Sequence, residues 1–346
     1  MKNTKNIRKL IIILVVMSSI LKCCGVKNLS VSSNIVTKNP VKVGVLVYSD
    51  DVFSSLIANS LEDIQKENEN KVEFTIFNAK GNPALESQIL NTMLEDRYDL
   101  ILANVVGKIT PELIESSINE ARQRSIPIIF FNTTPEKLDV IRSYSKALMI
   151  NDDSKKIGIL QGEMIANTWN TKKDVIDKNN DNIMQYIMIK GENQSILTDE
   201  RTKYSILTIN NSGIKTEELA SVTANWDKKL AQSTIEQLFL KYGSRIEIII
   251  ANNDAMAIGA VKALQHYGYN IGDKAKTIPV YGINGRPEAQ ELIKKEFMAG
   301  SVFQNPRTYA DALYTIGMNF VSGNNPIEGT NYEFDITGVV IHIQPE

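Results

Sequence analysis

The chain has 346 residues, of which 43% are hydrophobic and 23% are charged, and its formal net charge is −2. These values are typical of a globular protein of about two domains and exclude disordered, collagen-like and coiled-coil chains. The nearly neutral charge provides no basic field, so no nucleic-acid partner is expected. Two histidines, His266 and His342, lie far apart, which argues against a histidine-based metal centre. The two cysteines, Cys23 and Cys24, are adjacent and indicate no disulfide framework.

The N-terminus has the pattern of an export signal. Residues 1–9 contain basic residues and no acid, and residues 10–21 form an apolar run. This run is shorter than the roughly 20 residues that span a bilayer, so it predicts a signal peptide over residues 1–23. Leu21, three residues before Cys24, resembles the start of a bacterial lipobox, and Cys24 is the predicted lipidation site. Because Lys22 fits such a box poorly, modification of Cys23 and ordinary cleavage remain alternatives.

Cleavage before Cys24 changes the charge of the mature chain. Five basic residues and no acid would be removed, so the net charge would fall from −2 to −7. Residues 24–40 would then form a tether. The predicted location is extracytoplasmic, with attachment to the cell membrane through the lipid.

Apolar runs alternate with helix-period segments from Val41 onwards, which predicts parallel βαβ units. The first half is expected to contain strands at 41–47, 72–79, 100–104 and 126–132, with helices over about 53–64, 83–96 and 111–124. The second half is expected to contain strands at 183–191, 218–224, 246–252, 278–284 and 300–304. Its helices are expected at 153–169, 199–212, 226–242, 254–267, 286–295 and 306–322. The pattern predicts an α/β protein with two doubly wound parallel-sheet lobes.

Polar and aromatic side chains gather where the predicted strands end. Ligands of parallel sheets bind at the carboxyl ends of the strands, and two such sheets can close around a small molecule. Planar amide, carboxylate and guanidinium groups suit the paired hydroxyls of a sugar, and aromatic rings suit its C–H faces. The candidates are Asp51, Phe53, Asn104, Arg201, Trp226, Asn253, Asn284 and Gln304. Each has a structural alternative, such as a helix N-cap for Asn253 or a core position for Trp226.

Catalytic motifs are missing from the sequence. It contains no GxSxG, HExxH or GxxxxGK[ST] pattern. No acid–base pair emerges at the strand ends, so an enzyme of sugar metabolism is not expected.

Residues 177–185 space oxygen-bearing groups as a calcium-binding loop does. The residues at positions 1, 3, 5, 7 and 9 are Asp177, Asn179, Asp181, Ile183 and Gln185. Position 12 is Met188, which cannot supply the usual bidentate carboxylate, and the loop runs into a predicted strand. A helix–loop–helix calcium hand is therefore ruled out. A calcium loop that takes its carboxylate from elsewhere and a simple polar turn both remain open.

Several long segments resemble the periplasmic galactose/glucose-binding proteins, which serve ABC sugar importers and chemoreceptors. The segments are YSDDVF (48–53), FFNTTPE (130–136), DSKKIGILQGEMIA (153–166), GIKTEEL (213–219), ANWD (224–227), ANNDAMAIGAVKAL (251–264) and IPVYGINGRPEA (278–289). The resemblance runs from about Val41 to about Ile343 and implies the periplasmic binding protein type 1 fold. It implies a first lobe of residues 41–128 plus 305–338 and a second lobe of residues 129–304, joined by a multi-segment hinge. Residues 339–346 would be a short return segment.

The resemblance also implies roles for single residues. The aromatics that would sandwich a sugar ring are Phe53 and Trp226. The polar groups that would bond its hydroxyls are Asp51, Asn104, Arg201 and Asn253. Glu247 matches the external carboxylate that loop 177–185 lacks, so the resemblance implies a structural Ca²⁺ held by the five loop residues and Glu247.

Four positions depart from the family pattern. Ser195 and Leu197 stand where the family has a His and an Asp, Asn284 replaces an acidic residue, and Gln304 replaces a shorter amide. Ser195 is included with Asn284 and Gln304 among the expected sugar-binding residues. Hydrogen bonds to charged groups contribute about 1.5–3 kcal/mol each. The absence of two carboxylates and an imidazole from the expected sugar contacts therefore predicts weak binding of glucose and galactose, or a different preferred sugar.

The implied partners are a small sugar and an ABC permease, with the protein itself a monomer. An alternative is a sugar sensor that docks on a membrane histidine kinase or chemoreceptor. A repressor of similar fold is excluded because the chain starts with a signal peptide rather than a helix-turn-helix.

Overall fold

The computed structural model describes residues 39–48, 52–105, 111–133, 138–334 and 339–341. The predicted signal peptide, Cys24 and Asp51 therefore lie outside the described residues. None of the helices in the described part of the chain is both long and apolar enough to span a bilayer.

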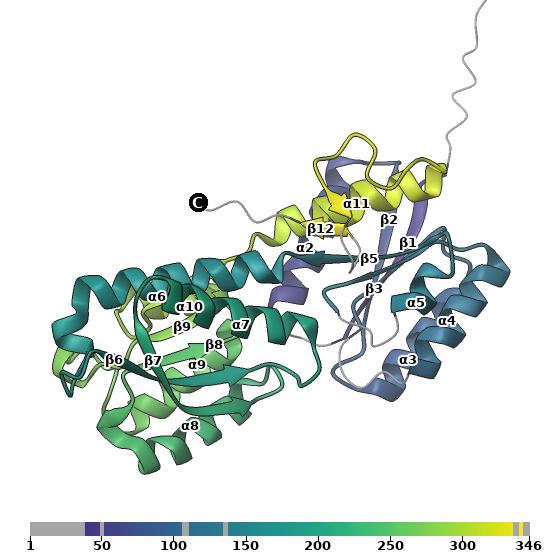
Figure 1. Cartoon of the computed structure of the whole chain (residues 1–346). Coiled ribbons are helices and arrows are strands. Elements are labelled where there is room, and N and C mark those ends of the chain that lie inside the picture. Colours follow the sequence, from purple (N-terminus) through teal and green to yellow (C-terminus); the bar gives the residue numbers. More distant parts are fainter. Residues whose placement is uncertain (1–38, 49–51, 106–110, 134–137, 335–338, 342–346) are drawn as a thin grey trace, which may run out of the picture. The chain divides into compact units, whose positions relative to one another are not determined.

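The first sheet has seven strands in the order β11-β12-β5-β4-β3-β1-β2 (Figure 1). Its strands are β1 (Val41–Val47), β2 (Val72–Asn78), β3 (Leu100–Ala103), β4 (Ile128–Phe131), β5 (Ala147–Asp152), β11 (Glu333–Phe334) and β12 (Val339–Ile341). Neighbouring strands run parallel, except that β11 pairs antiparallel with β12. The continuous apolar runs of β1, β3 and β4 suit strands that are covered on both faces.

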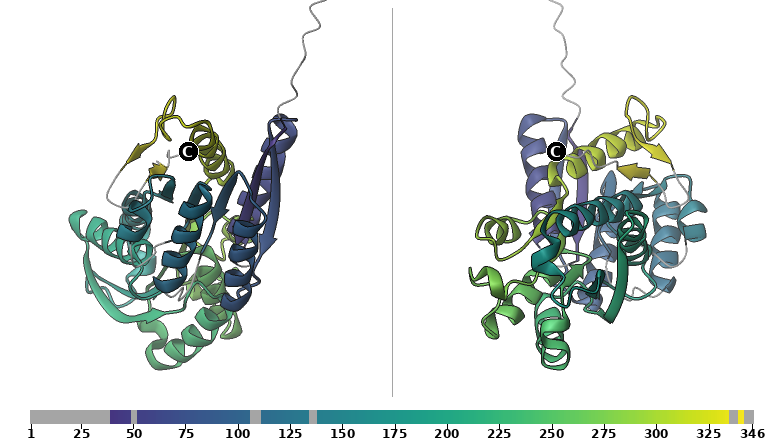
Figure 2. Two further views of the ribbon diagram at one scale, coloured as in Figure 1. Left: turned by 90° about the vertical axis from the view of Figure 1, so that its right-hand side faces the viewer. Right: turned by 60° about the vertical axis from the view of Figure 1, so that its left-hand side comes forward.

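Helices cover both faces of this sheet (Figure 2). They are α2 (Val52–Glu67), α3 (Pro83–Glu95), α4 (Pro111–Arg124), α5 (Leu138–Arg142) and α11 (Pro306–Ser322). Ile57 of α2 and Leu313 of α11 pack with Val45 on one face. Met93 of α3 and Ile118 of α4 are buried on the opposite face. A helix from near the end of the chain thus completes the core of the first sheet.

The second sheet has five parallel strands in the order β10-β9-β8-β6-β7. Its strands are β6 (Ile183–Lys190), β7 (Lys215–Thr223), β8 (Ile248–Ala251), β9 (Val280–Asn284) and β10 (Gly300–Phe303). The helices are α6 (Ser154–Ile176), α7 (Ile196–Asn211), α8 (Lys228–Tyr242), α9 (Asp254–His266) and α10 (Pro287–Lys294), with 3₁₀ turns η1 (Gly243–Arg245) and η2 (Lys274–Lys276).

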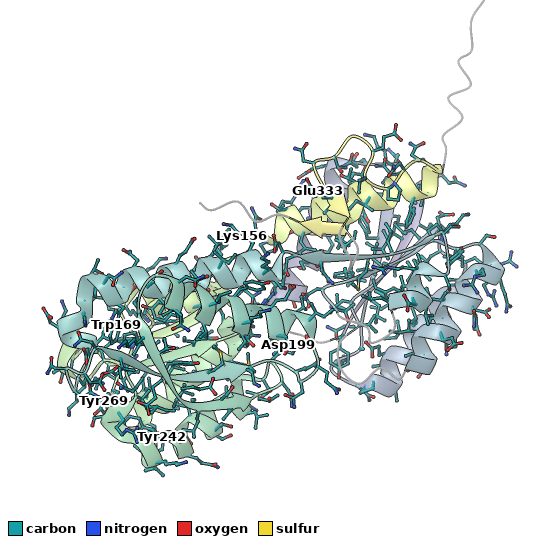
Figure 3. The ribbon with its side chains drawn as sticks, in the orientation of Figure 1. Lys156, Trp169, Asp199, Tyr242, Tyr269 and Glu333 are labelled. Carbon is teal, nitrogen blue, oxygen red and sulfur yellow. The ribbon has the colours of Figure 1, made fainter. Side chains whose placement is uncertain are left out.

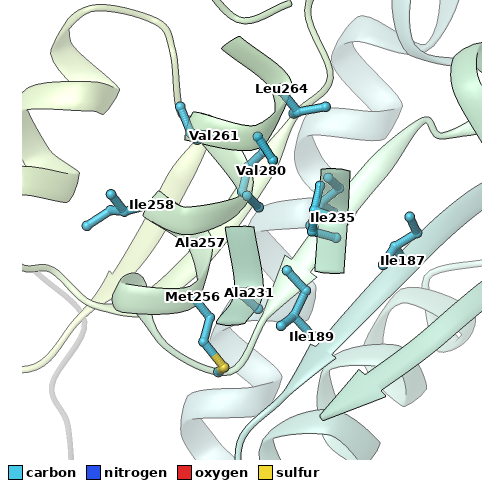
Figure 4. Close-up of a cluster of buried hydrophobic side chains, with 14 of the residues drawn as sticks. Ile187, Ile189, Ala231, Ile235, Met256, Ala257, Ile258, Val261, Leu264 and Val280 are labelled. Carbon is cyan, nitrogen blue, oxygen red and sulfur yellow. The ribbon is translucent and has the colours of Figure 1, made fainter. Parts of the chain in front are cut away.

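The core of the second sheet is divided between its two faces. Ile187 and Val280 of the strands pack against Ile235 of α8 and Val261 of α9 (Figure 4). Trp169 of α6 is buried on the other face (Figure 3). The alternating pattern of the sequence therefore gives two parallel sheets, each with helices on both faces, and the predicted α/β fold class is confirmed.

Helix α6 is longer than its sequence pattern predicts. It reaches Ile176 instead of residue 169, and Lys172 interrupts it with a non-helical conformation (φ −129°, ψ 22°). Loop 177–185 therefore follows the helix directly, since Asp177 is the C-cap of the helix.

Strand pairing assigns residues 128–152 to the first sheet, whereas the expected boundary placed residues from 129 onwards in the second lobe. β4 pairs with β3, and β5 pairs with β4, so both belong to the first sheet. By sheet membership the chain passes to the second sheet after Asp152, not after residue 128. β12 pairs with β5, so residues 339–341 also add to the first sheet. Strand β5 was not predicted because its sequence, ALMIND, is short and ends in two polar residues.

Candidate functional site

Arg201 is positioned by an unusually close contact between two helices. Gly158 and Gly162 of α6 face the backbone of α7, which carries Arg201. A Cβ atom at Gly158 would lie 2.9 Å from the carbonyl oxygen of Arg201, and one at Gly162 would lie 2.5 Å from that of Ser205. Only glycine allows backbones to approach so closely. The two glycines therefore fix α7, and with it the height of Arg201 above the sheet.

The guanidinium of Arg201 is buried and contacts a carboxylate that the sequence analysis did not select. Its Nη2 atom lies 3.2 Å from Oδ2 of Asp152, the last residue of β5. Gln304 donates its amide to the same Oδ2 atom. Asn284 in turn donates to Oε1 of Gln304 at 2.6 Å. Two predicted site residues, Arg201 and Gln304, thus meet at one carboxylate, and Asn284 joins them through Gln304.

The other two nitrogen atoms of the Arg201 guanidinium differ in whether they find a hydrogen-bond acceptor. Its Nη1 atom donates to the carbonyl oxygen of Asn252 at 3.0 Å. The Nε atom is buried and finds no acceptor among the described residues. A buried donor without an acceptor is unfavourable by about 1–3 kcal/mol, so it suits a hydroxyl group supplied from outside the chain.

Trp226 lies beside this cluster in a strained loop. Asn225 and Trp226 both have left-handed backbone conformations, with φ of 48° and 62°. A Cβ atom at Gly191 would lie 2.2 Å from the Trp226 ring, so the ring lies directly against the glycine backbone. The Arg201 guanidinium carbon is 5.9 Å from the ring centroid. Strain in two successive residues is a feature of functional sites, where the surrounding structure holds the chain in place.

Asn252 forms hydrogen bonds with three residues around Arg201 and Trp226, namely Gly191, Thr202 and Arg201 itself. Its side-chain oxygen accepts the backbone N–H of Gly191 at 3.1 Å and the hydroxyl of Thr202 at 3.2 Å. Because its carbonyl also accepts from Arg201, the residue links β6, α7 and β8. Asp152 and Asn252 are the two residues that the prediction missed. A strand-end signal existed for Asn252, whereas Asp152 was hidden because β5 itself was not predicted.

Phe53 and Asn104 follow strands of the first sheet, Phe53 in the first turn of α2 after β1 and Asn104 directly after β3. Phe53, near the start of α2, meets the Tyr309 ring edge-on at 6.2 Å between centroids. Asn104 donates its amide to the carbonyl oxygens of Phe131 and Asn132, both at 3.2 Å. Its side-chain oxygen accepts from the backbone N–H of Tyr48 at 3.4 Å. Asn104 thus links the ends of neighbouring strands by hydrogen bonds. A ligand that bonds to the Asn104 side chain would share that side chain with these backbone groups.

Two further predicted site residues form helix caps in this structure. The hydroxyl of Ser195 accepts the N–H of Thr198 at the start of α7, at 3.4 Å. The side chain of Asn253 accepts the N–H of Met256 at the start of α9, at 3.0 Å. The structural alternative given for Asn253 is therefore present, and it leaves the Asn253 amide group for other contacts.

A tyrosine after β1 and a glutamate after β6 are close enough to interact electrostatically. Burial, together with the carboxylates of Glu86 and Glu192, raises the pKa of Tyr48. Burial also raises the pKa of Glu192, which follows β6. Residues after strands of both sheets are therefore within electrostatic range of each other.

The residues of loop 177–185 converge with Glu247 through hydrogen bonds. Glu247 accepts the backbone N–H of Lys178 at 2.8 Å and that of Gln185 at 3.0 Å. Asp177 accepts the N–H groups of Asp181 and Asn182 at 3.1 and 3.0 Å. Two further bonds close the loop: Asp181 accepts the N–H of Ile183 at 2.8 Å and the side-chain amide of Gln185 at 2.9 Å. Asn179 also donates to Asp181 at 2.9 Å.

Basic side chains balance the charges of this loop only in part: the ammonium group of Lys178, within the loop, attracts Glu247 without forming an ion pair. Among the described residues, no Lys or Arg forms an ion pair with Asp177, Asp181 or Glu247. Burial, with some contribution from Asp177 and Asp181, raises the pKa of Glu247 to about 7. The donor set is entirely oxygen, which is the chemistry of a hard cation such as Ca²⁺. In the described parts of the chain, no three His, Cys, Asp or Glu side chains are already arranged around one metal position.

Comparison with protein families identifies the fold family. Residues 43–325 match the model described as "Periplasmic binding protein domain". The chain belongs to the periplasmic binding protein family. Members of this family act outside the cytoplasm, as solute-binding proteins rather than enzymes.

Two relatives illustrate the range of the family. The chain is 31% identical over 299 residues to the D-galactose/methyl-galactoside binding periplasmic protein MglB of Haemophilus influenzae, covering 84% of this chain and 85% of that protein. It is 23% identical over 277 residues to the ribose import binding protein RbsB of Salmonella typhimurium, covering 80% of this chain and 83% of that protein.

Solved structures share the fold at lower identity. A solute-binding protein from Bacillus halodurans with bound myo-inositol has a TM-score of 0.67 at 22% identity, covering 83% of this chain and 91% of that one. One from Actinobacillus succinogenes with bound D-allose has a TM-score of 0.69 at 18% identity, covering 89% and 96%.

Proposed function

We propose that the protein is an extracytoplasmic solute-binding protein that captures a small sugar at the strand ends of its two sheets and delivers it to an ABC importer. Its 31% identity to a galactose-binding protein over most of both chains supports a sugar as the ligand. The sugar would contact the polar groups of the second sheet and the aromatic groups Phe53 and Trp226. Asp51, outside the described residues, would contribute from the end of β1.

The observation that carries this proposal is the buried set of Arg201, Asn284 and Gln304 around Asp152. Planar donors and acceptors from a helix and two strand ends meet at one place, next to the Trp226 ring. Such groups can bond neighbouring hydroxyls while an aromatic face covers the C–H side of a sugar ring. The partnerless Nε donor of Arg201 would bond one of these hydroxyls.

The residue changes at this site favour a ligand other than glucose or galactose. Ser195 caps a helix and Leu197 is an apolar side chain, so neither replaces the imidazole and carboxylate expected from the resemblance. Asn284 supplies a neutral amide where an acid is expected. Losing charged hydrogen bonds at about 1.5–3 kcal/mol each lowers the affinity for those two sugars by several decades.

Loop 177–185 and Glu247 would hold a structural Ca²⁺. Bound there, the ion would offset the buried carboxylates of Asp177 and Glu247 and the exposed one of Asp181, and so stabilise the second sheet. Asn179 and Gln185 would turn their side-chain oxygens towards the cation, and Ile183 would offer its carbonyl.

Cys24 would carry the lipid anchor, and replacing it by Ala should release the protein from membranes of the producing cells.

Isothermal titration calorimetry with a panel of sugars and polyols tests the proposed function. The purified mature protein should bind at least one neutral sugar with micromolar affinity or better, and glucose and galactose more weakly. Trp226→Ala should weaken the best ligand at least tenfold, whereas Trp169→Ala, in the core of the opposite face, should act only on stability. Absence of binding for every sugar tested would refute the proposal, and micromolar glucose binding would refute the altered specificity.

A further inference from the structure

Asp152 occupies a central position among the predicted ligand-binding groups. Its Oδ2 atom accepts hydrogen bonds from both Arg201 and Gln304, and its Oδ1 atom accepts from the hydroxyl of Ser154 at 3.1 Å. The side chains of Asp152 and Arg201 are only 3% and 5% exposed. The carboxylate is therefore shielded from water and committed to the groups that are expected to face the sugar.

The charge of this cluster is balanced. Arg201 contributes one positive charge and Asp152 one negative charge, while Asn284, Gln304 and Ser154 are neutral. In the described part of the chain, no second Lys or Arg hydrogen-bonds to this cluster. An arginine without such a partner would attract anions, because the guanidinium fork binds carboxylates and phosphates strongly. Here the fork is already paired with a carboxylate of the protein.

The hydrogen-bond chain also fixes which atoms face a ligand. Gln304 must direct its amide nitrogen towards Asp152, so its oxygen is turned to Asn284. The Nε donor of Arg201 is the one guanidinium N–H group whose nitrogen finds no described acceptor. A hydroxyl group suits this arrangement because it can accept from Nε and donate to the carboxylate. A ligand carboxylate can only accept, and it would meet the like charge of Asp152.

We propose that Asp152 is a specificity-determining residue that makes the site select uncharged polyhydroxy ligands and reject sugar acids. This inference rests on the proposed function, since it defines the ligand class of the same site. Like charges placed together in a desolvated site are unfavourable by several kcal/mol, which corresponds to a discrimination of roughly a hundredfold or more. The discrimination arises from one side chain at the end of β5, not from the residues that the family resemblance assigns.

The test compares neutral sugars with their acids in the wild-type protein and in two variants. Calorimetry would use D-galactose with D-galacturonate and D-glucose with D-glucuronate, each added to the full mature chain with Ca²⁺ present. D-Ribose and myo-inositol would serve as further neutral probes. Asp152→Asn removes the charge and keeps the shape of the side chain. Asp153→Asn removes the same charge one residue further on, and asparagine can keep the N-cap bond to Lys156.

Asp152→Asn should raise the ratio of uronate to hexose association constants at least tenfold, whereas Asp153→Asn should leave this ratio within twofold of the wild type. A purely structural role for Asp152 would weaken the binding of neutral and acidic ligands together and leave the ratio unchanged, which would overturn the inference.

If Asp152→Asn does not fold, the wild-type protein still decides, since uronate binding as tight as hexose binding contradicts the inference. A wild-type protein that binds no sugar refutes the proposed function, and the inference with it. Binding of a neutral sugar with an unchanged ratio refutes the inference alone.

Discussion

Two clusters of oxygen-bearing side chains in this protein differ in how their charge is compensated. In the cluster around Asp152, the carboxylate is paired with the Arg201 guanidinium at 3.2 Å. In the loop 177–185 cluster, three carboxylates are held by backbone N–H groups and side-chain amides. No described Lys or Arg forms an ion pair with them, and only Lys178 attracts one of them, Glu247, through space. A balanced cluster is complete without an ion and suits a neutral ligand. A cluster with excess negative charge would be stabilised by a cation from solution, so the same residue types would serve two different purposes.

The largest expected effect comes from breaking the balance at Asp152. Arg201→Met leaves a buried carboxylate without its cation, which should lower the free energy of unfolding by about 3–5 kcal/mol. Urea unfolding at neutral pH measures this change. Lys203→Met removes the same charge from an exposed position of the same helix and should change stability by less than about 0.5 kcal/mol. Equal effects of the two variants would show that Asp152 does not depend on Arg201.

Asp254 provides a third case, in which neutral donors hold a buried carboxylate. It accepts from the Ser301 hydroxyl at 2.6 Å and from the backbone N–H of Arg286 at 2.7 Å. Burial raises the pKa of Asp254 to about 7. An acid whose pKa is raised on folding contributes stability that is fully present below its unfolded pKa of about 4 and is lost as the pH rises to about 7.

This loss should amount to about 4 kcal/mol in the free energy of unfolding. Asp254→Asn cannot ionise, so its stability should depend less on pH over the same window. Chemical denaturation at half-unit pH steps from pH 4 to pH 8 compares the two proteins. Parallel pH profiles would contradict the assignment of this effect to Asp254.

Addition of a cation should stabilise the unbalanced loop. At a Ca²⁺ concentration a hundred times the dissociation constant, binding adds about 2.7 kcal/mol to the free energy of unfolding, and a chelator removes it. Differential scanning calorimetry with Ca²⁺ or with EGTA should therefore show a higher melting temperature in Ca²⁺.

Glu247→Gln should abolish this difference, whereas Glu217→Gln should keep it. Glu217 lies near the same loop, 3.4 Å from the Gln185 amide, but it is paired with Arg245. A melting temperature that does not respond to chelation would exclude a structural Ca²⁺.

The smallest change in the free energy of unfolding is expected for a surface ion pair. Lys228 and Glu288 lie 2.7 Å apart, but 30% and 50% of their side chains are exposed, so solvent screens their attraction. Glu288→Gln should lower the free energy of unfolding by less than about 1 kcal/mol, and 1 M salt should remove most of the difference. A loss as large as that of Arg201→Met would show that burial does not decide the strength of these pairs.

The sequence predicted the fold well where its patterns were long and uniform. Helix α11 begins and ends at the predicted residues 306 and 322, and β1 matches its predicted range 41–47. Short strands with a uniform apolar run, such as β3 and β8, were predicted, whereas short elements that mix apolar and polar residues were missed. Strand β5 is such an element, and its loss from the prediction displaced the lobe boundary and concealed Asp152.

The candidate site was predicted less completely, since sequence order does not show which strand ends meet. Arg201, Asn284 and Gln304 were selected as strand-end or helix-start residues, and the structure links them to Asp152 by hydrogen bonds. The bonds of Asn104 to two backbone carbonyls could not be foreseen, because they depend on the side-by-side placement of β3 and β4. Asp51 lies outside the described residues, so its predicted role stays a prediction.

The packing of α11 against the first sheet has a consequence for the order in which the chain can fold. Tyr309 of α11 donates to the carbonyl of Ile150 at 2.9 Å and accepts the N–H of Asn132 at 3.0 Å, more than 150 residues earlier. The second sheet consists of one uninterrupted stretch, so it can form as soon as β10 has emerged during synthesis. The first sheet begins to emerge sooner but must wait for α11, and its exposed apolar face is the part that a chaperone would need to protect.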